Sequence, residues 1–372
     1  MCDVPALRFP EFSGEWKTSS IGEQFELYSG NTPNRMNKNL FDGSINWITS
    51  GELKAHYISD TKEKISEDAV RNNNLKILPI GTFVIAIYGL EADGVRGTCS
   101  ITTKESTISQ ACMAFTSKKD IQNEFLYSWY KKHGNVIGIK YAQGTKQQNL
   151  SYDIIEKFNL SYPCIEEQER LIRFISLIDE RIATQNKIIE KLETLIKGII
   201  ETVISSQKPN TLIKNCLECN SSTLQESQVA ETGAFPVYGA TGISGYTETA
   251  DINGESILII KDGSGVGTVK FVTGEYSYIG TLNSLSAKDG YCLKYIYIAL
   301  QRFNFEPYKT GMAIPHIYFK DYGKAKIFCP TIKEQFAIAK RISSIEDKVS
   351  VEKRILFYYQ AQKSYLLSQM LI

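Results

Sequence analysis

Several features that would assign this chain to a familiar class are missing from its sequence. Its 372 residues carry a formal net charge of only +1, so no basic excess points to nucleic acid. No apolar run approaches the roughly 20 residues that a membrane-spanning helix needs. The first residues contain Asp3, Pro5 and Pro10 and lack the apolar stretch of a secretory signal. We therefore expect a cytoplasmic protein.

Metal-binding and disulfide patterns are also missing. Cys216 and Cys219 form one CxxC, but no second pair and no nearby histidine completes a zinc set. The three histidines are scattered, at His56, His133 and His316. The eight cysteines show no disulfide-framework spacing, which fits a reducing compartment. The sequence thus predicts neither a metal site nor a disulfide scaffold.

Catalytic motifs are absent as well. The chain has no Pro-Pro-Tyr/Phe tetrapeptide of the amino-methyltransferase type, and no nuclease-like cluster of carboxylates and lysine. The glycine-rich run Gly263–Gly267 fits neither GxxxxGK[ST] nor GxGxxG, and we interpret it as a β-turn. Three isolated histidines do not assemble a Ser-His-Asp or Cys-His arrangement. The sequence therefore predicts no catalytic site and no cofactor held by this chain.

What the sequence does contain is an internal repeat. Two segments align without a gap at an offset of 167 residues. Five residues of the first copy meet identical partners in the second: Gly144, Lys157, Pro163, Glu167 and Gln168 align with Gly311, Lys324, Pro330, Glu334 and Gln335. A repeat of this length indicates two copies of one structural unit.

A long helix is predicted after each Glu-Gln pair, over 166–207 and 331–372. Apolar residues recur there with the alternating spacing of four and three that is typical of a coiled-coil seam. At about 1.5 Å per residue, each helix would be about 55 Å long and would act as a spacer. The seam residues are Leu171, Ile175, Ile178, Ile182, Ile189, Leu192, Ile196, Ile199 and Val203, then Ile338, Ile342, Ile345, Val349, Leu356, Tyr359, Leu366 and Met370.

Both seams are interrupted by a polar residue at the same repeat position, Gln185 and Glu352. An antiparallel pairing of the two helices would bring these residues together, where a polar pair fixes register. The helices carry net charges of −2 and +3, which favours their pairing with each other. The alternative is that each polar side chain reaches solvent by itself.

The segments before the helices, 1–165 and 208–330, are of a different type. Short β-type runs such as Gly81–Tyr88 and Gly254–Ile260 are followed by glycine-rich turns. A short helix is expected at about 121–132 in the first copy and about 292–302 in the second. The sequence thus predicts an α/β (α+β) fold with two similar domains, the first enlarged by insertion, and two long helices.

The order of domain, helix, domain and helix resembles the specificity (S) subunit of type I restriction–modification systems. Three motifs carry the resemblance, which covers essentially the whole chain. They are Pro5-Ala-Leu-Arg-Phe-Pro10 followed by Gly14-Glu-Trp16, then Phe235-Pro-Val-Tyr-Gly-Ala-Thr-Gly242 with Gly245-Tyr246, and the Pro-x-x-x-Glu-Gln start of each long helix.

The resemblance implies a specific arrangement and role. Two target recognition domains, at 1–165 and 208–330, would each read one half of a bipartite double-stranded DNA site. The helices would pack as an antiparallel coiled coil with pseudo-two-fold symmetry, set the gap between the half-sites and bind two methyltransferase (M) subunits. Those subunits would hold S-adenosylmethionine and methylate adenine, and a motor-nuclease (R) subunit would join for restriction.

Candidate DNA contacts are polar residues on loops, since Arg, Lys, Asn and Gln read base edges and phosphates. We expect one cluster at the glycine loop, a second at the turn after the β-run and a third on a polar loop with Asn31 and Asn37. The glycine loop could equally serve only as a cap for the following segment. The three sets are Lys140, Tyr141, Lys146, Gln147, Gln148 and Asn149, matched by Tyr308, Lys309 and His316; Tyr88 and Arg96, matched by Lys261 and Ser264; and Asn34, Arg35 and Lys38.

The near-neutral charge predicts weak DNA binding by this chain alone, with the methyltransferase subunits supplying much of the phosphate contact. A rival function remains open, that of a coiled-coil scaffold whose globular domains bind protein.

Overall fold

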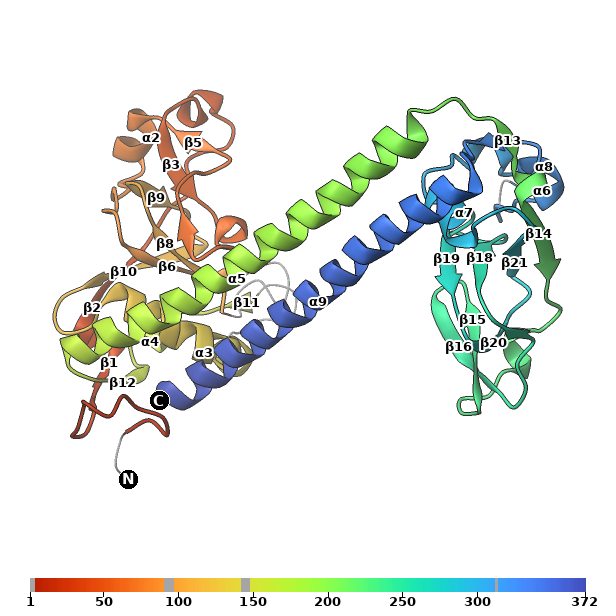
Figure 1. The fold of residues 1–372 in the computed structure, drawn as a ribbon. Helices are drawn as coiled ribbons and strands as arrows, with labels where there is room; N and C mark the ends of the chain where they lie inside the picture. Colours follow the sequence, from red (N-terminus) through yellow and green to blue (C-terminus); the bar gives the residue numbers. More distant parts are fainter. Residues whose placement is uncertain (1–3, 90–96, 142–147, 312–313) are drawn as a thin grey trace. The chain divides into compact units, whose positions relative to one another are not determined.

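The computed structural model describes residues 4–89, 97–141, 148–311 and 314–372 (Figure 1). By its internal contacts the chain divides into two compact units, 1–184 with 355–372 and 185–354. Each unit holds one globular domain and one part of each long helix. These helices are α5 (Ile165–Ile200) and α9 (Ile332–Met370), which begin within a residue of the predicted starts. The predicted domain boundaries at 165/166, 207/208 and 330/331 stay a prediction, because the compact units cut through both helices.

The first domain is built on a five-stranded sheet in the order β2–β10–β6–β8–β4, antiparallel apart from the β4–β8 pair. Helix α3 (Asn123–Tyr141) packs on β6, β8 and β10, and Phe83, Phe115 and Phe125 are fully buried between them. The sheet strands are β2 (Phe25–Ser29), β4 (Tyr57–Ile58), β6 (Phe83–Ala86), β8 (Cys99–Thr102) and β10 (Cys112–Ser117).

A smaller three-stranded sheet, in the order β5–β3–β9, lies in the same domain and has its own core around Trp47, Ile65 and Leu75. Its strands are β3 (Ile45–Ile48), β5 (Lys64–Ile65) and β9 (Ser106–Ile108), and helix α2 (Glu67–Asn72) contributes Ala69 to that core. Strands β3 and β9 run parallel.

The second domain repeats this plan with four antiparallel strands in the order β14–β21–β18–β19, on which α7 (Leu293–Leu300) packs. A second sheet, β16–β15–β20–β17, contains the parallel pair β15–β20. The strands are β14 (Leu217–Ser221), β15 (Phe235–Gly239), β16 (Gly242–Thr247), β17 (Ile252–Asn253), β18 (Ser256–Ile260), β19 (Val269–Val272), β20 (Glu275–Tyr278) and β21 (Leu282–Ala287).

Short elements match between the domains as well. Where each domain joins the long helices, its first and last strands pair: β1 (Lys17–Ser20) with β12 (Asn159–Tyr162), and β13 (Thr211–Leu212) with β22 (Lys326–Ile327). Four-residue helices also correspond, namely α1 (Ile21–Gln24) and α4 (Tyr152–Ile155) with α6 (Ile213–Cys216) and α8 (Phe319–Tyr322). The predicted duplication of one α/β domain is confirmed.

Two glutamines at equivalent repeat positions fasten the helices to their domains. The side chain of Gln168 is fully buried; its Oε1 accepts from Gln122 N at 3.0 Å and its Nε2 donates to Pro163 O at 3.1 Å. Gln335 does the same, accepting from Cys292 N at 3.0 Å and donating to Pro330 O at 2.9 Å. Each glutamine thus links the start of its long helix to the N-terminal end of the domain's own helix, which explains why this residue recurs.

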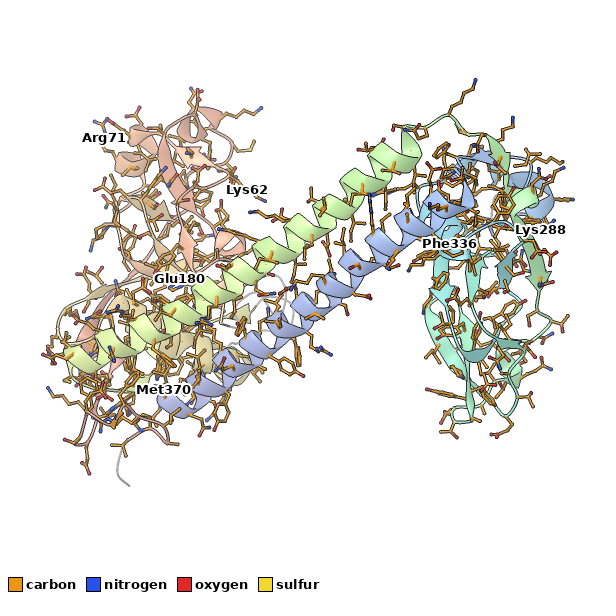
Figure 2. All side chains as sticks on the ribbon, viewed as in Figure 1. Lys62, Arg71, Glu180, Lys288, Phe336 and Met370 are labelled. Carbon is orange, nitrogen blue, oxygen red and sulfur yellow. The ribbon has the colours of Figure 1, made fainter. Side chains whose placement is uncertain are left out.

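The two long helices pair antiparallel along the predicted seam (Figure 1). Within the first unit, Lys363 Nζ lies 2.5 Å from Asp179 Oδ1, and within the second, Lys353 Nζ lies 2.7 Å from Glu193 Oε1. Every seam residue named above is buried or half-buried, and Met370 (Figure 2) joins Leu171 in the core of the first domain. The predicted coiled coil is confirmed.

The polar interruptions of the seam lie in contact inside the second unit. Gln185 and Glu352 are 7% and 6% exposed, and Gln185 Nε2 donates to the Glu352 carboxylate and, at 3.1 Å, to its backbone carbonyl. The side chains therefore satisfy each other rather than reaching solvent separately. That they fix register stays a prediction.

Two helix ends differ from the prediction. Helix α3 continues to Tyr141, nine residues beyond the expected end, although Gly134 and Gly138 lie inside it. Gly134 is needed there because a Cβ atom would come within 2.6 Å of Gly97 Cα. Helix α5 ends at Ile200 and is followed by one π-helical turn, Glu201–Ser205. In the described ranges, no helix is both long and apolar enough to cross a membrane.

Candidate nucleic-acid interface

Two of the predicted contact clusters come together in the first domain. Strand β7 (Tyr88–Gly89), which follows β6, pairs antiparallel with β11 (Gln148–Asn149), and Tyr88 stands opposite Asn149. The next residue continues the pairing, since Leu150 N donates to Ile87 O at 2.8 Å. Sequence separation hid this proximity, because the turn after the β-run and the glycine loop are about sixty residues apart.

The second domain has the same short strand contact at equivalent positions. We call this contact the crossing of each domain. Lys261 and Asp262 follow β18; Asp262 forms a β-bridge with His316, and Ile317 N donates to Lys261 O at 2.9 Å. This hydrogen bond is the counterpart of the one between Leu150 and Ile87. Lys261 and His316 are half-buried at the crossing, and Ser264 is exposed on the adjoining turn.

The glycine-rich segment beside this second crossing is a turn, as predicted. Val266 N donates to Gly263 O at 3.2 Å, and Gly263 and Gly267 have φ values of +100° and +92°. Gly267 also has no space for a side chain, because a Cβ atom there would lie 2.9 Å from Phe305 Cβ. The turn is therefore held in place by packing, and it exposes Ser264.

An open pocket of about 470 Å³ lies at the crossing of the first domain. Tyr88 and Asn149 line it together with Gln110 and Tyr152, two residues that the sequence analysis missed. Gln110 and Asn149 are exposed, and Tyr152 is 45% exposed. An amide and a phenol of this kind both donate and accept hydrogen bonds. The only available signal for Gln110 was its place directly after the Ile108-Ser109 segment that matches Ile279-Gly280 in the second copy.

Lys140 and Tyr141 lie in the last turn of α3, beyond the helix end expected at about residue 132. Lys140 Nζ sits 5.2 Å from the centre of the Tyr141 ring, and that ring packs edge-on against Phe158 at 5.0 Å. The tyrosine is 36% exposed. Both residues therefore lie at the helix end that precedes the glycine loop.

Tyr308 and Lys309, the predicted partners in the second domain, are engaged with their own neighbours. The Tyr308 ring stacks on Phe303 at 5.7 Å, and Lys309 Nζ lies 2.5 Å from Glu306 Oε1. Both ion-paired groups face an open pocket of about 650 Å³ that also touches α5. These contacts favour a packing role for Tyr308 over base contact.

The polar loop at 31–38 is organised by its own side chains. Arg35 Nη1 lies 2.5 Å from Glu63 Oε1, and its guanidinium stacks on Phe41 and Trp47 at 4.9 and 5.0 Å. Asparagines of the loop cap local turns: Asn34 Oδ1 accepts from Met36 N, Asn37 Oδ1 from Asn39 N, and Asn31 Oδ1 from Thr32 N. Lys38 is exposed at the start of a short 3₁₀ helix.

Three predicted contacts, Arg96, Lys146 and Gln147, lie outside the described residues, and of Gln148 only the backbone is described. In the described part of the chain, no three His, Cys, Asp or Glu side chains gather as metal ligands. Cys216 of the CxxC faces Cys329, not Cys219.

A family model described as the type I restriction modification DNA specificity domain matches residues 13–194 and 215–356. The chain belongs to this family. The two matched segments fall on the two repeats, so the specificity domain occurs here twice, as the duplicated fold requires.

Relatives in the family are specificity subunits. The type I restriction enzyme MjaIX specificity subunit of Methanocaldococcus jannaschii is 28% identical over 48% of this chain. The EcoR124I/EcoR124II specificity subunit of Escherichia coli is 28% identical over 46% of this chain. These matches span only 42% and 43% of the two relatives' own lengths.

Two solved structures share the fold over almost the whole chain. The S subunit of a type I restriction-modification system from M. genitalium matches with a TM-score of 0.65 and 17% identity, covering 99% of both chains. A chain solved in work on complex assembly of a type I R-M system matches with a TM-score of 0.59 and 14% identity, covering 95% of this chain and 97% of that one. At these identities the likeness concerns the fold.

Proposed function

We propose that this chain is the DNA sequence-specificity subunit of a type I restriction–modification complex, and that each of its domains reads one half of a bipartite target. The observation that carries the proposal is the duplicated crossing. Tyr88 and Asn149 in one domain, and Asp262 and His316 in the other, occupy equivalent backbone positions next to the same hydrogen bond. The two domains thus have the same backbone framework at this position but carry different side chains on it. This arrangement suits the reading of two half-sites that differ in sequence.

The chemistry at each crossing fits base reading. Asparagine and glutamine amides pair with adenine edges, and lysine pairs with guanine acceptors or phosphate. The first domain offers Asn149 and Gln110, and the second offers Lys261 and His316. Because the backbone at each crossing is held by strand pairing, the donors are presented from a rigid frame.

The paired helices suit the role of a spacer that also carries other subunits. Along α9, large aromatic side chains stay exposed: Phe336 (Figure 2) is 59% exposed, Phe357 64%, Tyr358 61% and Tyr365 62%. Exposed aromatic side chains gathered on one element favour a protein partner. We infer that two methyltransferase subunits bind the helices, and that a motor-nuclease subunit joins for restriction.

Catalysis is assigned to those partners. In this proposal the methyltransferase subunits hold S-adenosylmethionine and methylate adenine, and the present chain, acting in the cytoplasm, supplies only sequence reading. The near-neutral charge suits such a division, because the partners can provide much of the phosphate contact.

The proposal is tested by DNA binding of the assembled complex. Replacing residues 146–149 by a Gly-Ser loop should abolish site-specific binding while the complex still assembles. The matched control is Lys326→Ala, which removes an exposed lysine of β22 that lies outside both crossings and should leave binding unchanged. Unchanged binding by the loop variant, with a protein captured by the globular domains instead, would favour the scaffold function.

A further inference from the structure

Two buried cysteines face each other where the second domain joins the long helices. Cys216, the last residue of α6, is fully buried, and Cys329, just before Pro330 and α9, is 8% exposed. Their sulfur atoms are 3.8 Å apart, and both belong to the same compact unit. At that separation a small adjustment of the side chains brings the sulfurs to the roughly 2.05 Å of a disulfide.

The backbone around the pair is held from several sides. Asn210 clamps Cys329, since its Oδ1 accepts from Cys329 N and its Nδ2 donates to Cys329 O, each at 2.8 Å. Strands β13 and β22 pair directly beside the two cysteines, and Tyr295 OH donates to Phe328 O at 2.8 Å. The contact between the sulfurs is therefore set by the fold and does not depend on a loose loop.

We propose that Cys216 and Cys329 form a reversible disulfide under oxidising conditions, which closes residues 217–328 into a covalent loop and locks the second recognition domain at its junction with α5 and α9. The oxidant is a peroxide. The proposal goes beyond the DNA-reading function and does not depend on it.

The two thiols differ in the way that such a reaction needs. Hydrogen bonding between them lowers the pKa of Cys329 and raises the pKa of Cys216. Cys329, which is also the more exposed of the two, is thus the nucleophile. Its thiolate attacks one peroxide oxygen, the O–O bond breaks, and the products are a Cys329 sulfenic acid and hydroxide, which takes up the proton that the Cys329 thiol released on ionising and becomes water. The Cys216 sulfur then attacks the Cys329 sulfur, the S–O bond breaks, and the leaving hydroxide takes the Cys216 proton to give a second water.

Two other cysteines of the chain have different surroundings. Cys219, on β14, is next to Cys216 in the CxxC, but burial raises its pKa to about 11, and its thiol is not the one that faces Cys216. Cys164 is exposed at the start of α5 and would react between molecules. Cys164→Ser is therefore the background for the experiment.

The experiment treats the full Cys164→Ser chain with hydrogen peroxide and maps its disulfides by mass spectrometry of peptides cut under non-reducing conditions. We expect one peptide pair linking Cys216 to Cys329, and a melting temperature of the second domain raised by about 5–10 °C that returns to its starting value with dithiothreitol. Cys329→Ala should abolish both changes, and Cys219→Ser, the matched control, should retain both.

Three results would overturn the proposal: Cys216 and Cys329 both remaining as free thiols, Cys329 oxidised to its sulfonic acid without a link, or a link from Cys216 to Cys219. Peptide mapping of the chain that retains both cysteines decides the matter even if Cys329→Ala does not fold. Failure here would leave the DNA-binding test of the proposed function unaffected.

Discussion

Gln185 and Glu352, which are related by the internal repeat, meet in the seam between the two long helices. The Gln185 amide donates to the carboxylate and to the backbone carbonyl of Glu352, and Lys348 Nζ lies 2.6 Å from the other carboxylate oxygen. All other seam positions that we predicted are apolar. We expect this polar pair to favour one alignment of the helices over its neighbours, at some cost in stability.

Leucine variants of this pair should show how much it contributes to the stability of the fold. Gln185→Leu alone removes the donor to one oxygen of the buried Glu352 carboxylate and leaves only Lys348 at the other, and we expect a loss of about 1–3 kcal/mol in the free energy of unfolding. The double variant Gln185→Leu/Glu352→Leu should regain that stability or exceed it, because a packed apolar pair replaces a buried polar one. Denaturant unfolding of the three proteins measures both effects. A double variant less stable than Gln185→Leu would contradict the account.

Acid should weaken the same contact. Hydrogen bonds from Lys348, and then from Gln185, hold the pKa of Glu352 below its usual range. A carboxyl group whose folded pKa is lowered contributes stability that is present above its unfolded pKa, about 4.3, and that is lost as the pH falls through the folded value. The unfolding free energy should therefore fall more steeply below about pH 4 in the parent chain than in Glu352→Gln. Equal slopes would show that this carboxylate is not stabilised by its neighbours.

Arg8 fastens the N-terminal segment to the start of α5. Its Nε and Nη2 each lie 2.7 Å from an oxygen of Glu167, whose side chain is only 1% exposed. Arg8→Ala leaves this carboxylate buried and unpaired, and we expect a loss of about 3 kcal/mol. Arg170→Ala is the control, because it breaks an exposed ion pair with Glu11 that should contribute less than about 1 kcal/mol. Similar losses in thermal unfolding for both variants would contradict the assignment.

The two crossings should act separately in recognition. In an assembled complex, Asn149→Ala should relax methylation at one half of the target and leave the other half unchanged, and His316→Ala should do the reverse. Loss of one good base contact reduces discrimination by about 1–3 kcal/mol, or roughly 5- to 150-fold at that base. Methylation of an oligonucleotide set with single-base changes in each half measures this. Relaxation of both halves by either variant would contradict separate reading.

Salt dependence should show how the phosphate contacts are divided. The isolated chain, with a net charge of +1, should bind its target weakly and with a shallow dependence on salt, whereas the complex should bind tightly with a steeper one. A titration of both by fluorescence anisotropy at several salt concentrations tests this. Tight, site-specific binding by the isolated chain would contradict it.

The parts of the fold that rest on periodicity and repetition were predictable from the sequence. The long helices, their seam and the meeting of Gln185 with Glu352 follow from apolar spacing and from one repeat offset. The recurrence of Gln168 and Gln335 was visible in the sequence. Their shared role became clear only from the hydrogen bonds that their side chains accept from Gln122 N and Cys292 N. Residues that bond across the fold leave no local signal.

The candidate site was predictable only in part, for the same reason. Tyr88 and Asn149 were each suspected, but their pairing depends on a strand contact between distant segments. Helix α3 extends past the expected end. Gly134 argues against a helix locally, but the glycine is there because Gly97 approaches too closely for a side chain. Arg35 was chosen for its charge, but its place between Glu63 and two aromatic rings could not be inferred from composition.

The most direct test of the central claim is to co-express this chain with its candidate methyltransferase subunit and to map methylated adenines by single-molecule sequencing. The account predicts a bipartite motif with a fixed unspecified gap, present with this chain and lost when it is omitted. The same motif in the absence of this chain would contradict its role as the sequence reader.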